Sequence, residues 1–166
     1  MPDTIAIRMQ DQDKHWMREA IRLSFEGMKQ GHGGPFGAIV VKDNRLIGKG
    51  YNRVLSSHDP TAHAEVEAIR EACRTLGDFQ LSGCTIYTSC EPCPMCMGAI
   101  YWARPERVFY ANTRADAAAI GFDDDFIYRE LKLDMQNRSL PIRELLREEA
   151  QEAFRFWEEK SDKIRY

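Results

Sequence analysis

Two short stretches of the chain hold residues that could bind a metal and move protons. In "PTAHAEVEAIREAC" (residues 60–73), His63 and Glu65 lie two positions apart, and "EPCPMC" contains Cys93 and Cys96 in a CxxC spacing. Imidazole nitrogen and thiolate sulfur are the donors that zinc prefers, and three protein ligands leave the fourth position of a tetrahedral zinc open for water. We therefore expect one catalytic zinc ion per chain, held by His63, Cys93 and Cys96.

Glu65 is the predicted proton carrier of this site. Water bound to zinc ionises near pH ~7, and an uncoordinated carboxylate beside the metal can accept a proton and return it to a substrate. In the middle of a helix, side chains two positions apart point about 200° away from each other, whereas at the first turn they can converge over the open end. Asp59, Pro60 and Thr61 are residue types that begin helices, which predicts His63 and Glu65 in that first turn.

The elements that must position these residues alternate between helices and strands. Apolar spacing predicts helices over residues 13–28, after Asp11 or Asp13 as a cap, over 62–76, over 94–103 and near 146–157. Residues 31–52 predict a loop and two short strands, with a turn at Asp43 and Asn44, and β-rich runs predict further strands over 84–90 and 107–112. This alternation predicts an α/β domain with helices packed on a central sheet.

Composition restricts the classes of function. The 166 residues suit one compact domain, residues 1–166, and the net charge of -3 argues against broad electrostatic capture of nucleic acid. Three of the five cysteines crowd together, which favours metal binding in a reducing compartment over a disulfide framework. We see no signal peptide or membrane-spanning run, and therefore expect a cytoplasmic protein without membrane partners that acts on small neutral substrates.

HxE followed by PCxxC is the signature of the zinc-dependent nucleobase deaminases, and the chain resembles the cytidine deaminase-like superfamily. "DPTAHAE", "EPCPMCMGAI" and Asn52 suit bacterial tRNA adenosine deaminases almost as well as other members, whereas "GGPFGA", "IYWARP", "GFDDDFIY" and the terminal "KIRY" are most similar to bacterial guanine deaminases. The match extends from about Lys14 to Tyr166. It implies a three-layer α/β/α sandwich with a mixed sheet of about five strands, and hydrolytic deamination of guanine to xanthine and ammonia in purine catabolism or salvage.

The resemblance also implies roles for individual residues. Zinc would lie on His63, Cys93 and Cys96, and Glu65 would transfer protons. The residues implied at the purine base are Asn52 and Asp124 as polar contacts, with Phe36, Ala64, Trp102 and Tyr166 around the ring. A homodimer is implied as well, in which the C-terminal segment, about residues 140–166, is exchanged between the subunits and carries Tyr166 into the partner's pocket.

Several alternatives stay open at this point. Cys90 could join His63, Cys93 and Cys96 in a closed, four-ligand structural site of a non-catalytic binding module. The zinc chemistry would equally suit a tRNA adenosine deaminase or a deaminase of another nucleobase or an amino-triazine. The predicted contact residues also have ordinary structural explanations: Asn52 could close a turn, Asp123–Asp125 could form a solvated acidic turn, Phe36 and Trp102 could pack in the core, and Tyr166 could be a frayed end.

Overall fold

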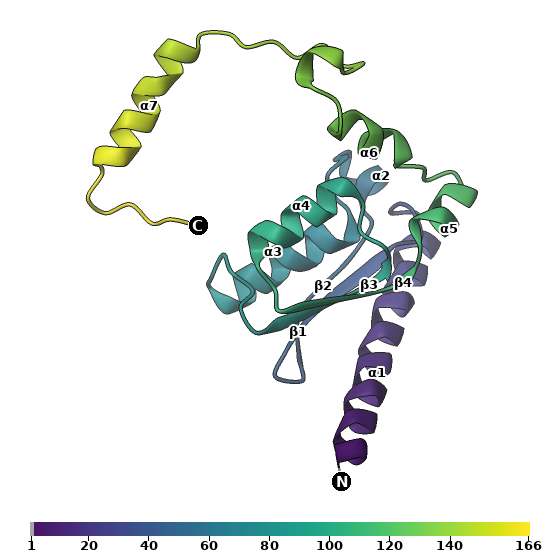
Figure 1. Cartoon of the computed structure of the whole chain (residues 1–166). Helices are drawn as coiled ribbons and strands as arrows, with labels where there is room; N and C mark the ends of the chain where they lie inside the picture. Colours follow the sequence, from purple (N-terminus) through teal and green to yellow (C-terminus); the bar gives the residue numbers. More distant parts are fainter. Residues whose placement is uncertain (1) are drawn as a thin grey trace. The chain divides into compact units, whose positions relative to one another are not determined.

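The centre of the fold is a mixed β-sheet with the strand order β2-β1-β3-β4 (Figure 1). The structure, a computed structural model, describes the backbone of residues 2–166 and the side chains of residues 11–166. Its strands are β1 (Gly37–Lys42), β2 (Arg45–Tyr51), β3 (Cys84–Cys90) and β4 (Arg107–Asn112). β1 runs antiparallel to β2 and β3, and β3 runs parallel to β4. Over the described residues the sheet thus has four strands, where about five were expected.

Helices cover both faces of this sheet, as the predicted three-layer sandwich requires (Figure 1). Helix α1 (Pro2–Lys29) packs on one face, and α3 (Ala64–Leu76) and α4 (Pro94–Ala103) pack on the other. Alternate side chains of β1 pack into the two cores, one on each face of the sheet, because successive strand residues point to opposite faces. Ile39 and Val41 pack with α1, and Ala38 and Val40 pack in the core that includes α3 and α4.

The predicted cap of the first helix is wrong. Asp11 and Asp13 lie inside α1, because the helix begins at Pro2. Asp13 instead accepts a hydrogen bond from the hydroxyl of Tyr87, which is buried on β3 beneath the helix. The predicted turn at Asp43 and Asn44 is confirmed, since both residues have positive φ angles of 47° and 57°.

Two glycines let β2 approach α3 closely. A Cβ atom at Gly50 would lie 2.4 Å from the carbonyl oxygen of Ala64, and one at Gly48 would lie 2.4 Å from that of Ala68. Strand and helix therefore pack backbone against backbone here, and any larger side chain would push the helix away. This contact holds the N-terminus of α3, with His63 and Glu65, at the end of β2 that leads into Asn52.

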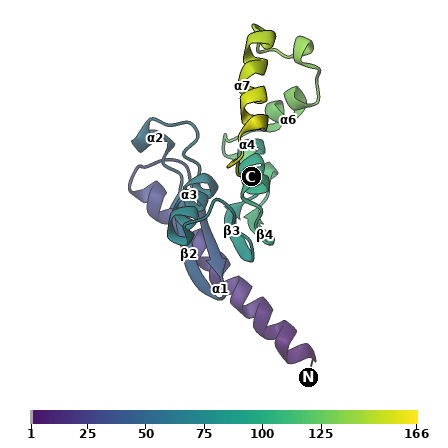
Figure 2. The same cartoon turned by 90° about the vertical axis from the view of Figure 1, so that its left-hand side faces the viewer.

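The chain divides into two compact units, Met1–Asp124 and Asp125–Tyr166. The first unit also contains the short helices α2 (Val54–Ser57) and α5 (Arg114–Ala119). The second contains α6 (Asp125–Leu131), the 3₁₀ helix η1 (Met135–Asn137) and the predicted last helix, α7 (Arg147–Glu159), drawn in yellow in Figures 1 and 2. None of residues 125–166, all of which the structure describes, is fully buried. No helix among the described residues combines the length and apolar character needed to cross a membrane.

Candidate metal centre

The predicted metal ligands lie at the N-termini of two helices that pack side by side on the same face of the sheet. His63 is the N-cap of α3 and Cys93 is the N-cap of α4, both with extended backbone, and Cys96 lies in the first turn of α4. His63 thus immediately precedes the helix, one position earlier than the predicted first turn. Pro94 opens α4, as expected of a residue without a free N–H at a position that needs none.

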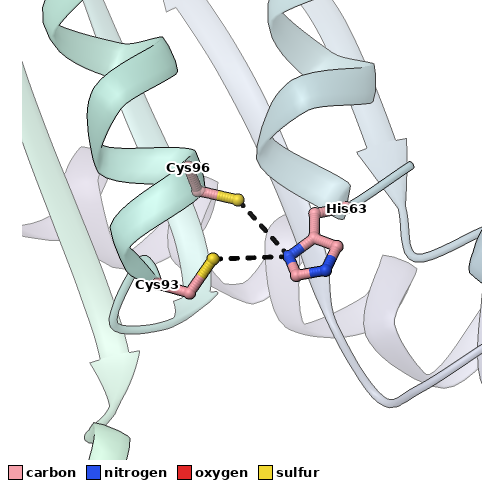
Figure 3. A group of neighbouring side chains, drawn as sticks. All are labelled: His63, Cys93 and Cys96. Atoms are coloured by element: carbon pink, nitrogen blue, oxygen red, sulfur yellow. Dashed lines mark hydrogen bonds between the residues drawn. The ribbon is translucent and has the colours of Figure 1, made fainter. Parts of the chain in front are cut away.

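The three ligand atoms converge. The Nδ1 atom of His63 lies 3.6 Å from the Sγ atom of Cys93 and 3.5 Å from that of Cys96, and both sulfurs point toward the imidazole (Figure 3). All three atoms lie within 4.8 Å of one another. A tetrahedral zinc about 2.3 Å from sulfur and about 2.0 Å from nitrogen separates such a pair of ligands by about 3.5 Å. The measured separations therefore fit a zinc ion between these side chains.

The electrostatics of the cluster also call for a cation. Hydrogen bonds from Cys96 and His63 lower the pKa of Cys93 to about 4, so Cys93 is a thiolate at neutral pH. The bond to Cys93, together with burial and the negative charge of Glu65, raises the pKa of Cys96 well above its usual range. A positive charge beside the two sulfurs would favour the ionised form of the second thiol. A zinc ion supplies that charge, and thiolate and imidazole donors suit it.

Glu65 lies beside the cluster without belonging to it. Its side chain is 5% exposed, its Oε2 atom accepts from the thiol of Cys96 at 3.4 Å, and burial raises the pKa of its carboxyl. The group of potential ligands among the described residues consists of His63, Cys93 and Cys96 alone. A buried carboxyl group next to a metal site, and not committed to the metal, has the position and the chemistry of a proton carrier.

Thr88 is a polar neighbour of Glu65 that the sequence interpretation missed. It lies on β3, is 1% exposed, and its hydroxyl donates to the Oε1 atom of Glu65 at 3.2 Å. The available signal was the alternation along β3, which places Thr88 on the same face as Ile86, in the core that contains α3. A buried hydroxyl on that face required a partner, although the sequence did not say which one.

Cys90 does not join the cluster. Its thiol donates to the backbone carbonyl of Thr113 at 3.6 Å, and burial raises its pKa to about 11. Among the side chains that the structure describes, the ligand atoms that converge are those of His63, Cys93 and Cys96, and the thiol of Cys90 is not one of them. Among the described residues, the geometry is therefore that of a site with three protein ligands, which leaves a fourth position for water, and not that of the closed four-ligand site.

Asn52 is buried at the end of β2 and serves the local turn. Its Oδ1 atom accepts from the backbone N–H groups of Gly34 at 3.3 Å and Val54 at 3.2 Å. A Cβ atom at Gly33 would lie 2.0 Å from that oxygen, so the "GGPFGA" loop depends on glycine for this approach. The carbonyl end of the side chain is thus committed to backbone, whereas the amide nitrogen is not used by these two bonds. Asn52 therefore closes the local turn, as its structural explanation predicts, and these two bonds leave its amide N–H groups for a ligand.

Asp124 and Phe36 also belong to the first unit. Burial raises the pKa of Asp124, and the negative charge of Cys93 raises it further, so Asp124 lies within electrostatic range of the cluster. Phe36 packs edge-on against Phe122, with ring centroids 4.9 Å apart, and borders the core around α3. Ala64 is fully buried at the start of α3.

Two predicted ring contacts are exposed in the structure. Trp102, near the end of α4, is 64% exposed, and Tyr166, in the second unit, is 68% exposed. Neither is thus a core residue. Their predicted roles at the base, like those of Phe36 and Ala64, stay predictions.

Comparison with known proteins agrees with this geometry. Residues 10–112 match the family described as the cytidine and deoxycytidylate deaminase zinc-binding region. A guanine deaminase of Bacillus subtilis is 51% identical over 151 residues, which cover 91% of this chain and 97% of that protein. A tRNA-specific adenosine deaminase of Aquifex aeolicus is 41% identical over 98 residues, which cover 59% of this chain and 64% of that protein.

Solved structures lead to the same group of proteins. The X-ray structure of the guanine deaminase from Bacillus subtilis superposes with a TM-score of 0.90 at 50% identity and covers 92% of this chain and 98% of that one. A guanine deaminase from Nitrosomonas europaea superposes with a TM-score of 0.63 at 34% identity, covering 66% of this chain and 63% of that one. Together with the three-ligand cluster, these matches show that the chain belongs to the zinc-binding cytidine and deoxycytidylate deaminase family.

Proposed function

We propose that this protein is a zinc-dependent aminohydrolase that converts guanine and water to xanthine and ammonia. The observation that carries the proposal is the buried carboxyl group of Glu65 beside three converging zinc donors. A structural zinc site has no need of such a group, and burying it costs free energy unless it is hydrogen-bonded. The similarity to the guanine deaminase of Bacillus subtilis over most of the chain, in sequence and in structure, supports guanine as the substrate.

In the proposed reaction, His63, Cys93 and Cys96 hold the metal and Glu65 moves the protons. Zinc, when bound, supplies a Lewis acid that lowers the pKa of water at the site. Glu65 takes a proton from the attacking water, which adds its oxygen to C2 of guanine. The same carboxyl delivers this proton to the ring nitrogen, then takes a second proton from the hydroxyl group now on C2 and passes it to the exocyclic amine, which leaves as ammonia while C2 becomes a carbonyl carbon of xanthine. The raised pKa of Glu65 suits a group that must hold a proton between these steps.

Recognition of the base is assigned to polar groups of the first unit. Guanine presents two adjacent donors, N1–H and the exocyclic amine, and an ionised carboxylate such as Asp124 can accept from both. Asn52 has amide N–H groups that its turn does not use. Phe36 and Trp102 are proposed to border the flat ring, because aromatic faces suit a heterocycle, and Ala64 is proposed to lie beside it.

We also infer a homodimer in which residues 140–166 are exchanged, so that Tyr166 reaches the partner's pocket and residues 1–166 form one domain only within the dimer. The support is the composition of the second unit, which exposes large apolar side chains, among them Leu145, Phe154 and Phe156, at 83%, 70% and 72%. Exposed apolar surface of this kind marks an interaction site. Sedimentation equilibrium should give twice the chain mass, and a monomer would contradict the inference.

The test of the proposed reaction is ammonia release by the zinc-loaded protein. Guanine, guanosine, cytosine, adenine, an amino-triazine and a tRNA anticodon stem-loop should be compared under the same conditions. We expect turnover of guanine well above that of every other compound. Activity on the stem-loop alone would show that the substrate is RNA and not guanine, and the proposed zinc mechanism would stand. Silence on all of them, with one zinc still bound per chain, would identify a structural zinc module.

A further inference from the structure

Thr88 lies in the most constrained part of the sheet. It is on the central strand β3, where its backbone pairs with Ala38 of β1 on one side and Tyr110 of β4 on the other. Its side chain is 1% exposed, and its hydroxyl lies 3.2 Å from the Oε1 atom of Glu65 and 3.0 Å from the backbone carbonyl oxygen of Cys90. The hydroxyl is therefore placed by the sheet, independently of the helix that carries Glu65.

The two oxygens of the Glu65 carboxyl group have different neighbours. Oε1 meets the hydroxyl of Thr88, and Oε2 meets the thiol of Cys96 at 3.4 Å. The last torsion of a glutamate side chain is broad and has no strong preference of its own. Without a partner on the strand side, the carboxyl group could turn away from the cluster. The contact with Thr88 keeps one oxygen on β3 and the other directed at the metal ligands.

We infer that Thr88 is a positioning residue, which holds the carboxyl group of Glu65 in the orientation that proton transfer needs. This inference rests on the proposed role of Glu65 and extends it to a residue outside the deaminase signature. A hydroxyl suits the task because it can donate to a carboxylate and can also accept from a carboxyl group. When the hydroxyl of Thr88 accepts from Glu65, it can donate its own proton to the carbonyl oxygen of Cys90. A β-branched side chain in a strand also has few χ1 rotamers, so the hydroxyl is held in place before the substrate arrives.

The experiment compares hydroxyl removal at two positions of the same strand. Thr88→Val keeps the shape of the side chain and removes the hydroxyl, and it should lower kcat for guanine by about 10- to 100-fold, as expected of a misplaced catalytic group. KM and the zinc content of one ion per chain should stay close to native. Thr88→Ser, which restores the hydroxyl, should recover kcat to within about 3-fold.

Thr85→Val is the matched control. Thr85 is also on β3 and is 6% exposed, but its hydroxyl is paired with the guanidinium of Arg107 at 3.5 Å and not with Glu65. This variant should keep native kcat. An equal loss of kcat in Thr85→Val and Thr88→Val, or native kcat in zinc-loaded Thr88→Val, would overturn the inference.

A crystal structure of zinc-loaded Thr88→Val without substrate provides a readout that does not depend on activity. The carboxyl group of Glu65 should be rotated or disordered there, and native orientation would overturn the positioning role. Should the valine variant fail to fold, Thr88→Ala makes the same comparison with a smaller side chain. If the native protein does not turn over guanine, the proposed substrate is wrong, and the orientation of Glu65 in the variant still decides the role of Thr88.

Discussion

Residues up to Asp124 build a core that buries Glu65 and Cys96, whereas residues 125–166 have no fully buried side chain. In the first unit, Glu65 and Cys96 are 5% and 0% exposed, and the elements that place them pack on both faces of one sheet. In the second, Phe154 and Trp157 on the longest helix are 70% and 44% exposed. The difference teaches that the three metal ligands and Glu65 all lie in the first unit, whereas the second unit leaves many of its large apolar side chains exposed within one chain.

The expected energetics agree with this contrast. Full burial of a large apolar side chain contributes about 1.5–3 kcal/mol to the free energy of folding. Because the phenylalanines of α7 are exposed, they gain little of this stabilisation within one chain. We therefore expect substitutions at the metal centre to act on kcat and zinc binding, substitutions at the proposed base contacts to act on KM, and substitutions in the second unit to act on KM and on assembly.

Replacing Glu65 should have the largest effect. Glu65→Gln keeps the size of the side chain and its contact with Thr88 but cannot carry a proton, so kcat should fall by about 100- to 10,000-fold. Ammonia release measures this loss, and metal analysis should still find one zinc per chain. Glu67→Gln, two residues along the same helix, is the control and should keep native kcat. Loss of zinc from Glu65→Gln would contradict the separation between proton carrier and ligands.

Asp124→Asn tests the proposed contact of Asp124, at the end of the first unit, with guanine. The substitution removes a charged acceptor whose hydrogen bonds contribute about 1.5–3 kcal/mol each, so KM for guanine should rise by about 10- to 100-fold with a smaller change in kcat. Asp123→Asn removes a charge from the same loop and is the control. Equal effects of the two substitutions would assign the role to the charge of the loop and not to Asp124.

Acidification should weaken guanine binding through the same residue. The pKa of Asp124 is raised by burial, so this carboxylate is protonated at a higher pH than an ordinary aspartate as the pH falls. KM measured against pH should therefore rise on the acid side, because the protonated group no longer accepts from both guanine donors. Asp124→Asn has no proton to gain, and its KM should lack this rise. The same acid rise in the variant would point to a different group.

Deleting residues 161–166 addresses the second unit and should have a smaller effect. Loss of one aromatic contact with the ring costs about 1 kcal/mol, so KM should rise by several-fold to about 10-fold while zinc content stays native. Tyr166→Phe retains the ring and should behave as the native protein. Native kinetics in the deletion variant would remove Tyr166 from the pocket.

Cys90→Ala should have the smallest effect on the site. Zinc content and kcat should stay native, because Cys90 bonds to the carbonyl of Thr113 and not to the cluster. The free energy of unfolding should fall by about 1 kcal/mol, as for an ordinary substitution of a buried residue. Urea denaturation measures this change. Loss of zinc from Cys90→Ala, comparable to that of Cys96→Ala, would restore the four-ligand site.

The metal centre was largely predictable because its determinants are local. A histidine or cysteine at a helix start, a CxxC spacing and a proline at the first helical position all act within one turn of chain. The same holds for the turn at Asp43 and Asn44. The beginning of α1 was not predictable in this way, since Asp13 has the residue type of a cap but lies inside a helix that begins at Pro2, where it accepts a hydrogen bond from Tyr87, 74 positions away.

By itself the sequence determined the donor set, the carboxylate beside it and the order of helices and strands, since spacing and periodicity act over a few residues. Only the tertiary structure decided that Cys90 stays outside the cluster and that Thr88 faces Glu65. The contact between Thr88 and Glu65 depends on how closely α3 lies on the sheet, and this approach is permitted by Gly48 and Gly50 on another strand. Packing between elements distant in the chain selects one partner among several chemically equivalent ones, and local sequence does not record that selection.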